Sequence, residues 1–248
     1  MARIDLNCDL GEGAGHDPDL MPLISSANIA CGAHAGDEAT MLATVRLARR
    51  HGVAIGAHPG FPDRAHFGRR EITVTPAEAQ ALVLAQIRLL QAVAGQGGGR
   101  VMHVKPHGAL YNLAARDAAI ALAVARAVGE ADARLILFGP PDSELVLAGE
   151  KCGLRVANEV FADRTYQPDG SLTPRSQPKA LITDENLAVA QVRRMVREGR
   201  VRTADGTDFI VRADTVCIHG DGPHPVQFAR RLRDELQKAG IAIKAPGA

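Results

Sequence analysis

The 248-residue sequence contains no tryptophan, and aromatic residues make up only 3% of it. Proteins that bind single-stranded nucleic acid stack the bases on aromatic side chains, so this scarcity argues against such a surface. The formal net charge is only +1, with 29 basic and 28 acidic residues spread along the chain. A near-neutral chain gives no electrostatic reason to bind nucleic acid or an acidic membrane surface. We therefore expect neither as a partner.

Long apolar runs are also absent, and the longest falls far short of the roughly 20 residues that span a bilayer. The chain starts with a charged, strand-like segment rather than a signal peptide, so we expect a cytoplasmic protein.

The four cysteines (Cys8, Cys31, Cys152 and Cys217) form no CxxC pair. We expect them to be small buried hydrophobic residues in a reducing compartment. The short step from Cys31 to His34 leaves a zinc site or a reactive thiolate as the alternative.

Motifs that bind nucleotide phosphates are missing as well. The sequence has no GxxxxGK[ST] loop, and no apolar strand runs into a GxGxxG sequence. A P-loop or a dinucleotide-binding fold is therefore not supported. The most glycine-rich stretch, residues 95–99, joins a helix to the following strand and is expected to be a flexible connector.

What the sequence does contain is an alternation of short apolar strands and helical segments, in a chain with 46% hydrophobic and 23% charged residues. We predict strands near residues 3–8, 26–31, 52–57, 101–105, 134–138, 154–160 and 214–219. We predict helices near residues 38–50, 76–94, 114–129, 143–152, 184–198 and 225–239. Residues 202–211 are expected to form a hairpin and residues 241–244 an edge strand. We expect a single domain over residues 1–248.

Three of these strands end in an alternation of apolar and polar residues. The polar members are Asp5, Asn7 and Asp9; His103, Lys105 and His107; and Cys217, His219 and Asp221. Successive side chains on a strand point to opposite faces, so one face of each strand is apolar and the other is polar. A doubly wound sheet is apolar on both faces, whereas a barrel can be polar inside. We therefore predict an α/β fold, an irregular, TIM-barrel-like β/α barrel of about seven strands.

Candidate reactive groups lie where the strands end, at the end of a barrel that carries catalytic residues. Asp9 is the strongest carboxylate candidate, because Asn7 and Asp5 share its face; the alternative is a structural acid that caps loop amides. Asp5 lies deeper, so a buried, hydrogen-bonded supporting role is expected for it. Glu12 is either a second acid or base or a solvated side chain.

His34 and His58 each come at the end of a strand with inward parity. Together with Asp9 they would suffice for a divalent metal site with an open position, or they could act as general acid and base without a metal. Lys105 also points inward. A buried ammonium needs a carboxylate or an anionic substrate beside it, so we expect either a salt bridge to Asp5 or Asp9 or a role in substrate binding.

Read together, these motifs resemble the LamB/YcsF family. The segments that carry the resemblance are DLNCDLGE (5–12), ANIACGAHAGD (27–37), AHPGFPD (57–63), VKPHGALYN (104–112), EVFADR (159–164) and IHGD (218–221). The resemblance implies an irregular β/α barrel related to the glycoside hydrolase/deacetylase superfamily. It also implies ATP-dependent ring opening of 5-oxo-L-proline to L-glutamate together with two partners, 5-oxoprolinase subunits B and C.

Carried over by position, the resemblance implies a site that contains Asn7, Asp9, His34, His58, Lys105, His107 and His219. We expect Asp9, His34, His58, Lys105 and His107 to be catalytic, and Asn7, Glu12, Asn112, Arg164 and His219 to bind the substrate. In our hypothesis Asp9 or an adjacent histidine deprotonates a water molecule. Lys105 and Arg164 hold the α-carboxylate or a phosphate, and His107 or His219 protonates the departing ring nitrogen.

Two other functions fit the same residues. One is a metal-dependent deacetylase or amidohydrolase acting on carbohydrate or amide substrates, with Asp9, His34 and His58 as ligands. The other is a non-catalytic subunit that presents the substrate to a partner. ATP binding by this chain or by its partners, a bound divalent metal and a homo-oligomeric assembly are left open at this point.

Overall fold

The computed structural model describes residues 2–218 and 224–247, and seven parallel strands in it close into a barrel. They are β1 (Arg3–Leu10), β2 (Ser26–Ala30), β3 (Ala54–His58), β4 (Val101–Val104), β5 (Ile136–Gly139), β6 (Arg155–Phe161) and β9 (Thr215–Ile218). Each strand pairs with the next in this order, and β9 closes the ring by pairing with β1 as well as with β6. The predicted irregular barrel of about seven strands is confirmed. The expected edge strand is β10 (Ala242–Ile243), which pairs with the start of β1.

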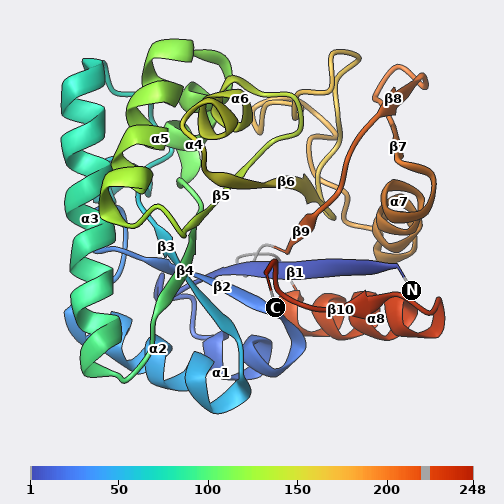
Figure 1. Cartoon of the computed structure of the whole chain (residues 1–248). Coiled ribbons are helices and arrows are strands. Elements are labelled where there is room, and N and C mark those ends of the chain that lie inside the picture. Colours follow the sequence, from blue (N-terminus) through green and yellow to red (C-terminus); the bar gives the residue numbers. More distant parts are fainter. Residues whose placement is uncertain (1, 219–223, 248) are drawn as a thin grey trace.

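Helices surround the strands, as Figure 1 shows. They are α1 (Asp17–Leu20), α2 (Glu38–His51), α3 (Pro76–Gln96), α4 (Gly108–Arg116), α5 (Ala118–Ala131), α6 (Glu144–Lys151), α7 (Glu185–Glu198) and α8 (Pro225–Lys238), with 3₁₀ turns η1 (Met21–Leu23) and η2 (Arg64–His66). The long helices α3 and α5 pack against each other on one flank of the barrel. No helix within residues 2–218 and 224–247 is long and apolar enough to cross a membrane.

Local sequence signals explain where the helices begin. The Thr75 hydroxyl accepts a hydrogen bond from the backbone N–H of Glu78, and the Glu78 carboxylate accepts one from the N–H of Thr75, so a capping box starts α3. The Asp37 carboxylate accepts a hydrogen bond of 2.8 Å from the N–H of Thr40 and caps α2.

The single helix predicted for residues 114–129 is wrong. Two helices, α4 and α5, occupy residues 108–131, and the Asp117 carboxylate separates them by accepting hydrogen bonds from the N–H groups of Ala119 and Ile120. An N-cap residue starts a new helix because its side chain satisfies backbone N–H groups that have no partner within the helix. The early start of α4 puts Tyr111 and Asn112 on a helix that begins at the mouth of the barrel.

The predicted hairpin over residues 202–211 is confirmed: β7 (Arg200–Arg202) pairs antiparallel with β8 (Asp208–Ile210).

The cysteine prediction holds only in part. All four cysteines are free, and Cys8, Cys31 and Cys217 are buried. Cys152 is exposed, because it directly follows the last turn of α6 on the outer surface.

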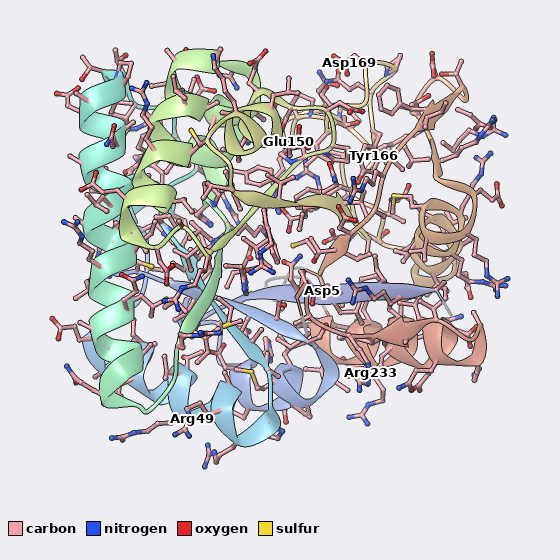
Figure 2. The ribbon with its side chains drawn as sticks, in the orientation of Figure 1. Asp5, Arg49, Glu150, Tyr166, Asp169 and Arg233 are labelled. Carbon is pink, nitrogen blue, oxygen red and sulfur yellow. The ribbon has the colours of Figure 1, made fainter. Side chains whose placement is uncertain are left out.

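The barrel interior carries a row of aligned polar positions. Asp9, Asn28, Gly56 and His103 are paired in register across β1 to β4. A Cβ atom at Gly56 would lie 2.0 Å from Nε2 of His103, so β3 needs a glycine here to leave room for the imidazole. The His103 ring fills that space, stacks on Phe138 at 4.4 Å and contacts Oδ1 of Asn28 at 2.9 Å. In Figure 2, Asp5 lies on β1, whereas Arg49 and Arg233 lie on surrounding helices.

Candidate functional site at the carboxyl ends of the strands

Asp5 forms the floor of the site and is fully buried. Its carboxylate accepts hydrogen bonds from the hydroxyl groups of Ser25 (2.6 Å), Ser26 (2.8 Å) and Thr215 (2.6 Å). Burial raises the pKa of Asp5 to about 6, although the three hydrogen bonds favour its charged form. Asp5 therefore has the buried, hydrogen-bonded supporting role that was predicted.

Asn7 connects the groups above that floor. Its Nδ2 donates hydrogen bonds to Oε1 of Glu159 (3.0 Å) and to Oγ1 of Thr215 (2.7 Å). Its Oδ1 accepts hydrogen bonds from Nδ2 of Asn28 (2.7 Å) and from Nζ of Lys105 (3.3 Å). With both ends of the amide engaged, Asn7 is fixed in one orientation and positions its neighbours rather than reaching into open space.

Lys105 lies between two carboxylates. Its Nζ is 2.9 Å from Oδ1 of Asp9 and 2.9 Å from Oε1 of Glu159, and it donates to Sγ of Cys217 at 3.0 Å. Burial disfavours the ammonium, but the negative charges of Asp9 and Glu159 outweigh burial and raise the pKa of Lys105 well above its ordinary value. The expected salt bridge to Asp9 is present, and the ammonium keeps its charge.

Glu159 on β6 is a site residue that sequence reasoning missed. It is 1% exposed and shares Lys105 with Asp9. The sequence did contain a sign of it, because Glu159 is the only acidic residue in a strand whose other residues are mostly apolar. Burying a carboxylate in such a strand is costly unless a cation lies beside it. Lys105, the lysine predicted to point inward, is the cation that such a carboxylate needs.

Asp9 is the acid that reaches the open end of the barrel. Its Oδ1 contacts Nζ of Lys105 at 2.9 Å and Nδ2 of Asn28 at 2.8 Å. Its Oδ2 lies 3.3 Å from Nε2 of His58. The Asp9 side chain lines a cavity of about 750 Å³, a volume within the range of small-molecule sites.

Three imidazoles and a second carboxylate gather beside Asp9. Glu12 follows β1, His34 follows β2, His58 ends β3 and His107 precedes α4, so each comes from the carboxyl end of a different strand. Oε1 of Glu12 lies 3.2 Å from Nε2 of His34, 3.6 Å from Nδ1 of His107 and 3.9 Å from Nε2 of His58. The rings of His34 and His107 are stacked, with centroids 3.8 Å apart. We refer to these four residues as the imidazole cluster.

Burial and neighbouring charge set the protonation of these rings. Burial, followed by the positive charge of His58, lowers the pKa of His34 to about 3 and that of His107 to about 2. Burial also disfavours the charged form of His58, but Asp9 outweighs burial and raises the pKa of His58 above its ordinary value. In the absence of any other cation, His58 is the ring in the cluster that gains a proton most readily.

The cavity wall contains two more predicted residues. Asn112 is exposed on α4 and Arg164 is buried, and both line the same cavity as Asp9. The Arg164 guanidinium donates to the carbonyl oxygens of Thr173 (2.6 Å) and Ala180 (3.3 Å). Arg164 belongs to the long segment between β6 and α7, so this loop contributes to the cavity wall.

Tyr111 also lines this cavity, and the predicted site omitted it. Burial, together with the charge of Glu159, raises the pKa of Tyr111 well above its ordinary value, so the phenol stays protonated.

Of the predicted residues, the structure brings together Asn7, Asp9, Glu12, His34, His58, Lys105 and His107, with Asn112 and Arg164 on the adjoining wall. His219 and Asp221 lie outside the described residues.

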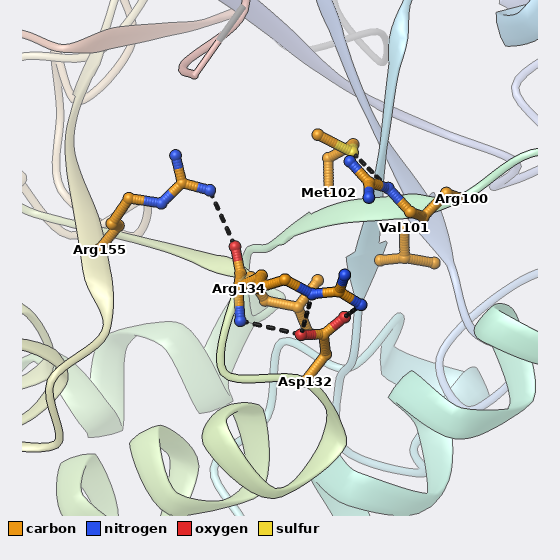
Figure 3. Close-up of a pocket in the computed structure, with 7 residues that line it drawn as sticks. Arg100, Val101, Met102, Asp132, Arg134 and Arg155 are labelled. Carbon is orange, nitrogen blue, oxygen red and sulfur yellow. Dashed lines mark hydrogen bonds and ion pairs between the residues drawn. The ribbon is translucent and has the colours of Figure 1, made fainter.

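A smaller cavity of about 160 Å³ lies at the opposite end of the barrel, where β4, β5 and β6 begin. Figure 3 shows hydrogen bonds among the residues that line it. The Asp132 carboxylate holds the guanidinium of Arg134 at 2.8 Å, and Arg155 donates to the carbonyl oxygen of Arg134 at 2.9 Å. Residues at this end of a β/α barrel contribute to stability rather than to chemistry.

Comparison with known proteins identifies the family. Residues 4–248 match the LamB/YcsF family. The chain belongs to the LamB/YcsF family. This confirms the resemblance that the sequence motifs indicated.

Curated relatives extend over the whole chain. A protein from Geobacillus kaustophilus that is named as the A subunit of 5-oxoprolinase is 57% identical over 250 residues, covering 99% of this chain and 98% of its own length. Proteins of the same name from Bacillus subtilis and Bordetella pertussis are 54% and 56% identical, with coverage of 97% or more on both sides.

Solved structures agree with the fold of this LamB/YcsF chain. The crystal structure of a lactam utilization protein from Thermus thermophilus superimposes with a TM-score of 0.92 at 48% identity, covering 98% of this chain and 99% of that one. A T48 deacetylase has a TM-score of 0.51 at 13% identity, covering 98% of this chain and 87% of that chain. The second similarity concerns the fold alone, and it agrees with the deacetylase-type barrel that the family resemblance implied.

Proposed function

We propose that this chain is the A subunit of a 5-oxoprolinase and that it takes part in the ATP-dependent hydrolysis of 5-oxo-L-proline to L-glutamate, with partner subunits B and C. Full-length relatives with that name, and a structural relative named for lactam utilization, support this proposal. The observation that carries it is the cavity of about 750 Å³ in which Asp9, Lys105 and Glu159 meet. A base held in one orientation within a partly closed pocket is what the hydrolysis of a stable amide requires.

Asp9 is the base in this proposal. Hydrolysis joins a water oxygen to the lactam carbonyl carbon, breaks the C–N bond and leaves the ring nitrogen with an added proton. Lys105 and Asn28 hold Oδ1 of Asp9 through contacts of 2.9 and 2.8 Å, which keeps the carboxylate ionised and fixes its direction. Asp9 lines the cavity, so it can accept the proton of a water molecule placed against the carbonyl carbon.

Arg164 is the group that binds the α-carboxylate. The Lys105 ammonium already contacts two carboxylates and a thiol, so its charge is used within the protein. Arg164 instead donates to two neutral carbonyl oxygens while it lines the cavity. A guanidinium matches the geometry of a carboxylate and binds it through two parallel hydrogen bonds. In this division of roles Lys105 positions Asp9, and Arg164 positions the substrate.

The proton for the departing ring nitrogen requires a separate donor. Nε2 of His107 contacts the carbonyl oxygen of Phe67 at 2.8 Å, which commits its N–H to the backbone. The other nitrogen, Nδ1, faces Nε2 of His58 at 2.9 Å. These contacts argue against His107 as the donor. His219, the other candidate from the sequence, lies outside the described residues.

The need for ATP follows from the chemistry of the lactam. A five-membered lactam is a resonance-stabilised amide whose hydrolysis is close to balanced, so turnover toward glutamate requires coupling. Transfer of the γ-phosphoryl group of ATP to the amide oxygen makes the carbonyl carbon more electrophilic. Water then adds to that carbon and the C–N bond breaks, which leaves an acyl phosphate, and a second water molecule hydrolyses the acyl phosphate to glutamate and phosphate. The sequence carries no P-loop, so in this proposal the partner subunits contribute part or all of the nucleotide site.

Reconstitution tests the proposal. The full chain, combined with the B and C subunits of the same organism, is expected to form one glutamate and one phosphate for each 5-oxo-L-proline consumed, and only when ATP is present. Coupled assays for glutamate and for phosphate measure both products. Omitting this chain is expected to abolish glutamate formation. Glutamate formed equally well without ATP or without this chain would contradict the proposal.

A further inference from the structure

The protonation of two histidines in the imidazole cluster is fixed by backbone carbonyl groups. Nδ1 of His58 lies 2.7 Å from the carbonyl oxygen of Lys105, and Nε2 of His107 lies 2.8 Å from the carbonyl oxygen of Phe67. A carbonyl oxygen only accepts hydrogen bonds, so both of these nitrogens carry the N–H. A neutral imidazole has one N–H, and its other nitrogen has a lone pair. When both rings are neutral, Nε2 of His58 and Nδ1 of His107 are therefore both lone-pair nitrogens.

These two lone pairs face each other. Nε2 of His58 and Nδ1 of His107 are 2.9 Å apart, which is a hydrogen-bonding distance, although the two atoms have no proton to share while both rings are neutral. The Glu12 carboxylate adds a third electron-rich group, 3.6 Å from the His107 nitrogen and 3.9 Å from the His58 nitrogen. Nε2 of His34 lies 3.2 Å from the same carboxylate oxygen. Electron-rich atoms from four residues thus converge on one point. Such a cluster of lone pairs requires a cation.

We propose that the imidazole cluster binds a divalent transition-metal ion of the zinc type, with Nε2 of His58, Nδ1 of His107, Nε2 of His34 and the Glu12 carboxylate as ligands. A shared proton would satisfy two of these atoms along one line, whereas four donors surround a common centre. One ligand atom from each of the four residues lies within 4.8 Å of all the others. The inference does not depend on which substrate the neighbouring cavity binds.

The spacing of the donors fits such an ion. Four ligands at about 2.0–2.1 Å from Zn²⁺ in a tetrahedron lie about 3.3–3.4 Å from one another. The separations given above run from 2.9 to 3.9 Å and lie on both sides of that value. Three imidazoles with one carboxylate favour zinc and neighbouring first-row metals over Mg²⁺ or Ca²⁺, which prefer oxygen ligands.

The surroundings of the cluster are those of a metal site. Metal-binding histidines donate their second ring N–H to a carbonyl or carboxylate, which fixes the tautomer, and the carbonyl groups of Lys105 and Phe67 do this for His58 and His107. His34 is held by stacking on His107, and its buried Nδ1 has no hydrogen-bond partner among the described residues. Its Nε2, beside Glu12, is thus the nitrogen that remains for a ligand.

The structure changes the ligand set that the sequence indicated. The sequence grouped Asp9 with His34 and His58, whereas the geometry replaces Asp9 by Glu12 and His107. Oδ1 of Asp9 is engaged by Lys105 and Asn28, and its Oδ2 lies 3.3 Å from the His58 nitrogen. The ion therefore lies beside Asp9, on the wall of the same cavity.

Direct metal binding tests this proposal. The full-length chain without a polyhistidine tag is stripped with chelator and titrated with Zn²⁺ by calorimetry, and with Co²⁺ while the visible absorption is recorded. We expect one ion per chain and cobalt bands typical of a four-coordinate site. Glu12→Gln and His107→Ala are expected to weaken Zn²⁺ binding at least about 100-fold. His103→Gln is the matched control, because His103 is also a buried imidazole inside the barrel but is not a ligand, and it is expected to leave Zn²⁺ affinity unchanged.

Two results would overturn the metal site. One is a wild-type chain that takes up neither Zn²⁺ nor Co²⁺ at micromolar concentration. The other is unchanged affinity in Glu12→Gln, which would place the ion elsewhere. Glu12 is only partly buried, so this variant remains informative even where His107→Ala does not fold, as circular dichroism would reveal. A wild-type chain that takes up neither ion in these titrations but still supports glutamate formation would remove the metal site and leave the proposed function standing.

Discussion

Asp9→Asn is expected to lower 5-oxoproline-dependent phosphate release by the reconstituted complex by a factor of about 10² to 10⁴, the usual contribution of a positioned general base. The substitution keeps the size of the side chain and its contact with Lys105, but the amide cannot accept the proton of the attacking water. The loss is expected in kcat more than in KM, because Arg164 and not Asp9 binds the substrate carboxylate in our account. Steady-state phosphate release with varied 5-oxo-L-proline measures both constants.

Asp37→Asn is the matched control for this experiment. Asp37 is exposed and caps α2, and asparagine caps helices as well as aspartate does, so the same chemical change is expected to leave turnover unchanged. Near-normal turnover in Asp9→Asn would remove Asp9 as the base. A loss of equal size in Asp37→Asn would mean that the assay reports folding or assembly of the complex rather than chemistry.

Lys105→Met is expected to lower the free energy of unfolding by about 3–5 kcal/mol. Methionine fills a similar volume but leaves the carboxylates of Asp9 and Glu159 without their shared cation inside the barrel. An uncompensated buried charge is far more costly than the loss of the ion pair itself. Urea denaturation followed by circular dichroism measures the change as a lower midpoint with an unchanged slope.

Two further variants isolate the cause of this loss. Lys238→Met removes an exposed lysine that pairs with Glu235 at 2.9 Å, and it is expected to cost less than about 1 kcal/mol. Adding Glu159→Gln to Lys105→Met removes one of the two stranded charges and is expected to restore part of the stability. If Lys105→Met cost no more than Lys238→Met, the charges inside the barrel would not be coupled as we describe.

The sequence was sufficient to predict the barrel and one wall of the site, for a simple reason. Side chains alternate along a strand and parallel strands end at the same edge, so the parity of Asn7, Asp9 and Lys105 placed them inside before any partner was known. The structure bears this out through the contacts of Lys105 with both other residues. Such parity arguments need no knowledge of strand order.

What the sequence could not supply depends on register and on loop conformation. Glu159 meets Lys105 inside the barrel because β5 pairs with both β4 and β6, an arrangement that no local pattern encodes. Glu12 reaches the imidazoles because the chain turns at Gly11, which has a φ of +71°, a conformation that glycine adopts without strain. The break between α4 and α5 was hidden because Asp117 looks like an ordinary polar residue within a helical run.

A crystal structure of the protein soaked with 5-oxo-L-proline tests the central claim most directly, namely that the groups at the carboxyl ends of the strands form one reaction chamber. We predict that the lactam lies in the cavity of about 750 Å³, with its carbonyl carbon on the side of Asp9 and its carboxylate against Arg164. A ligand bound elsewhere on the molecule, or bound with Asp9 on the far side of the lactam from its carbonyl carbon, would contradict the account.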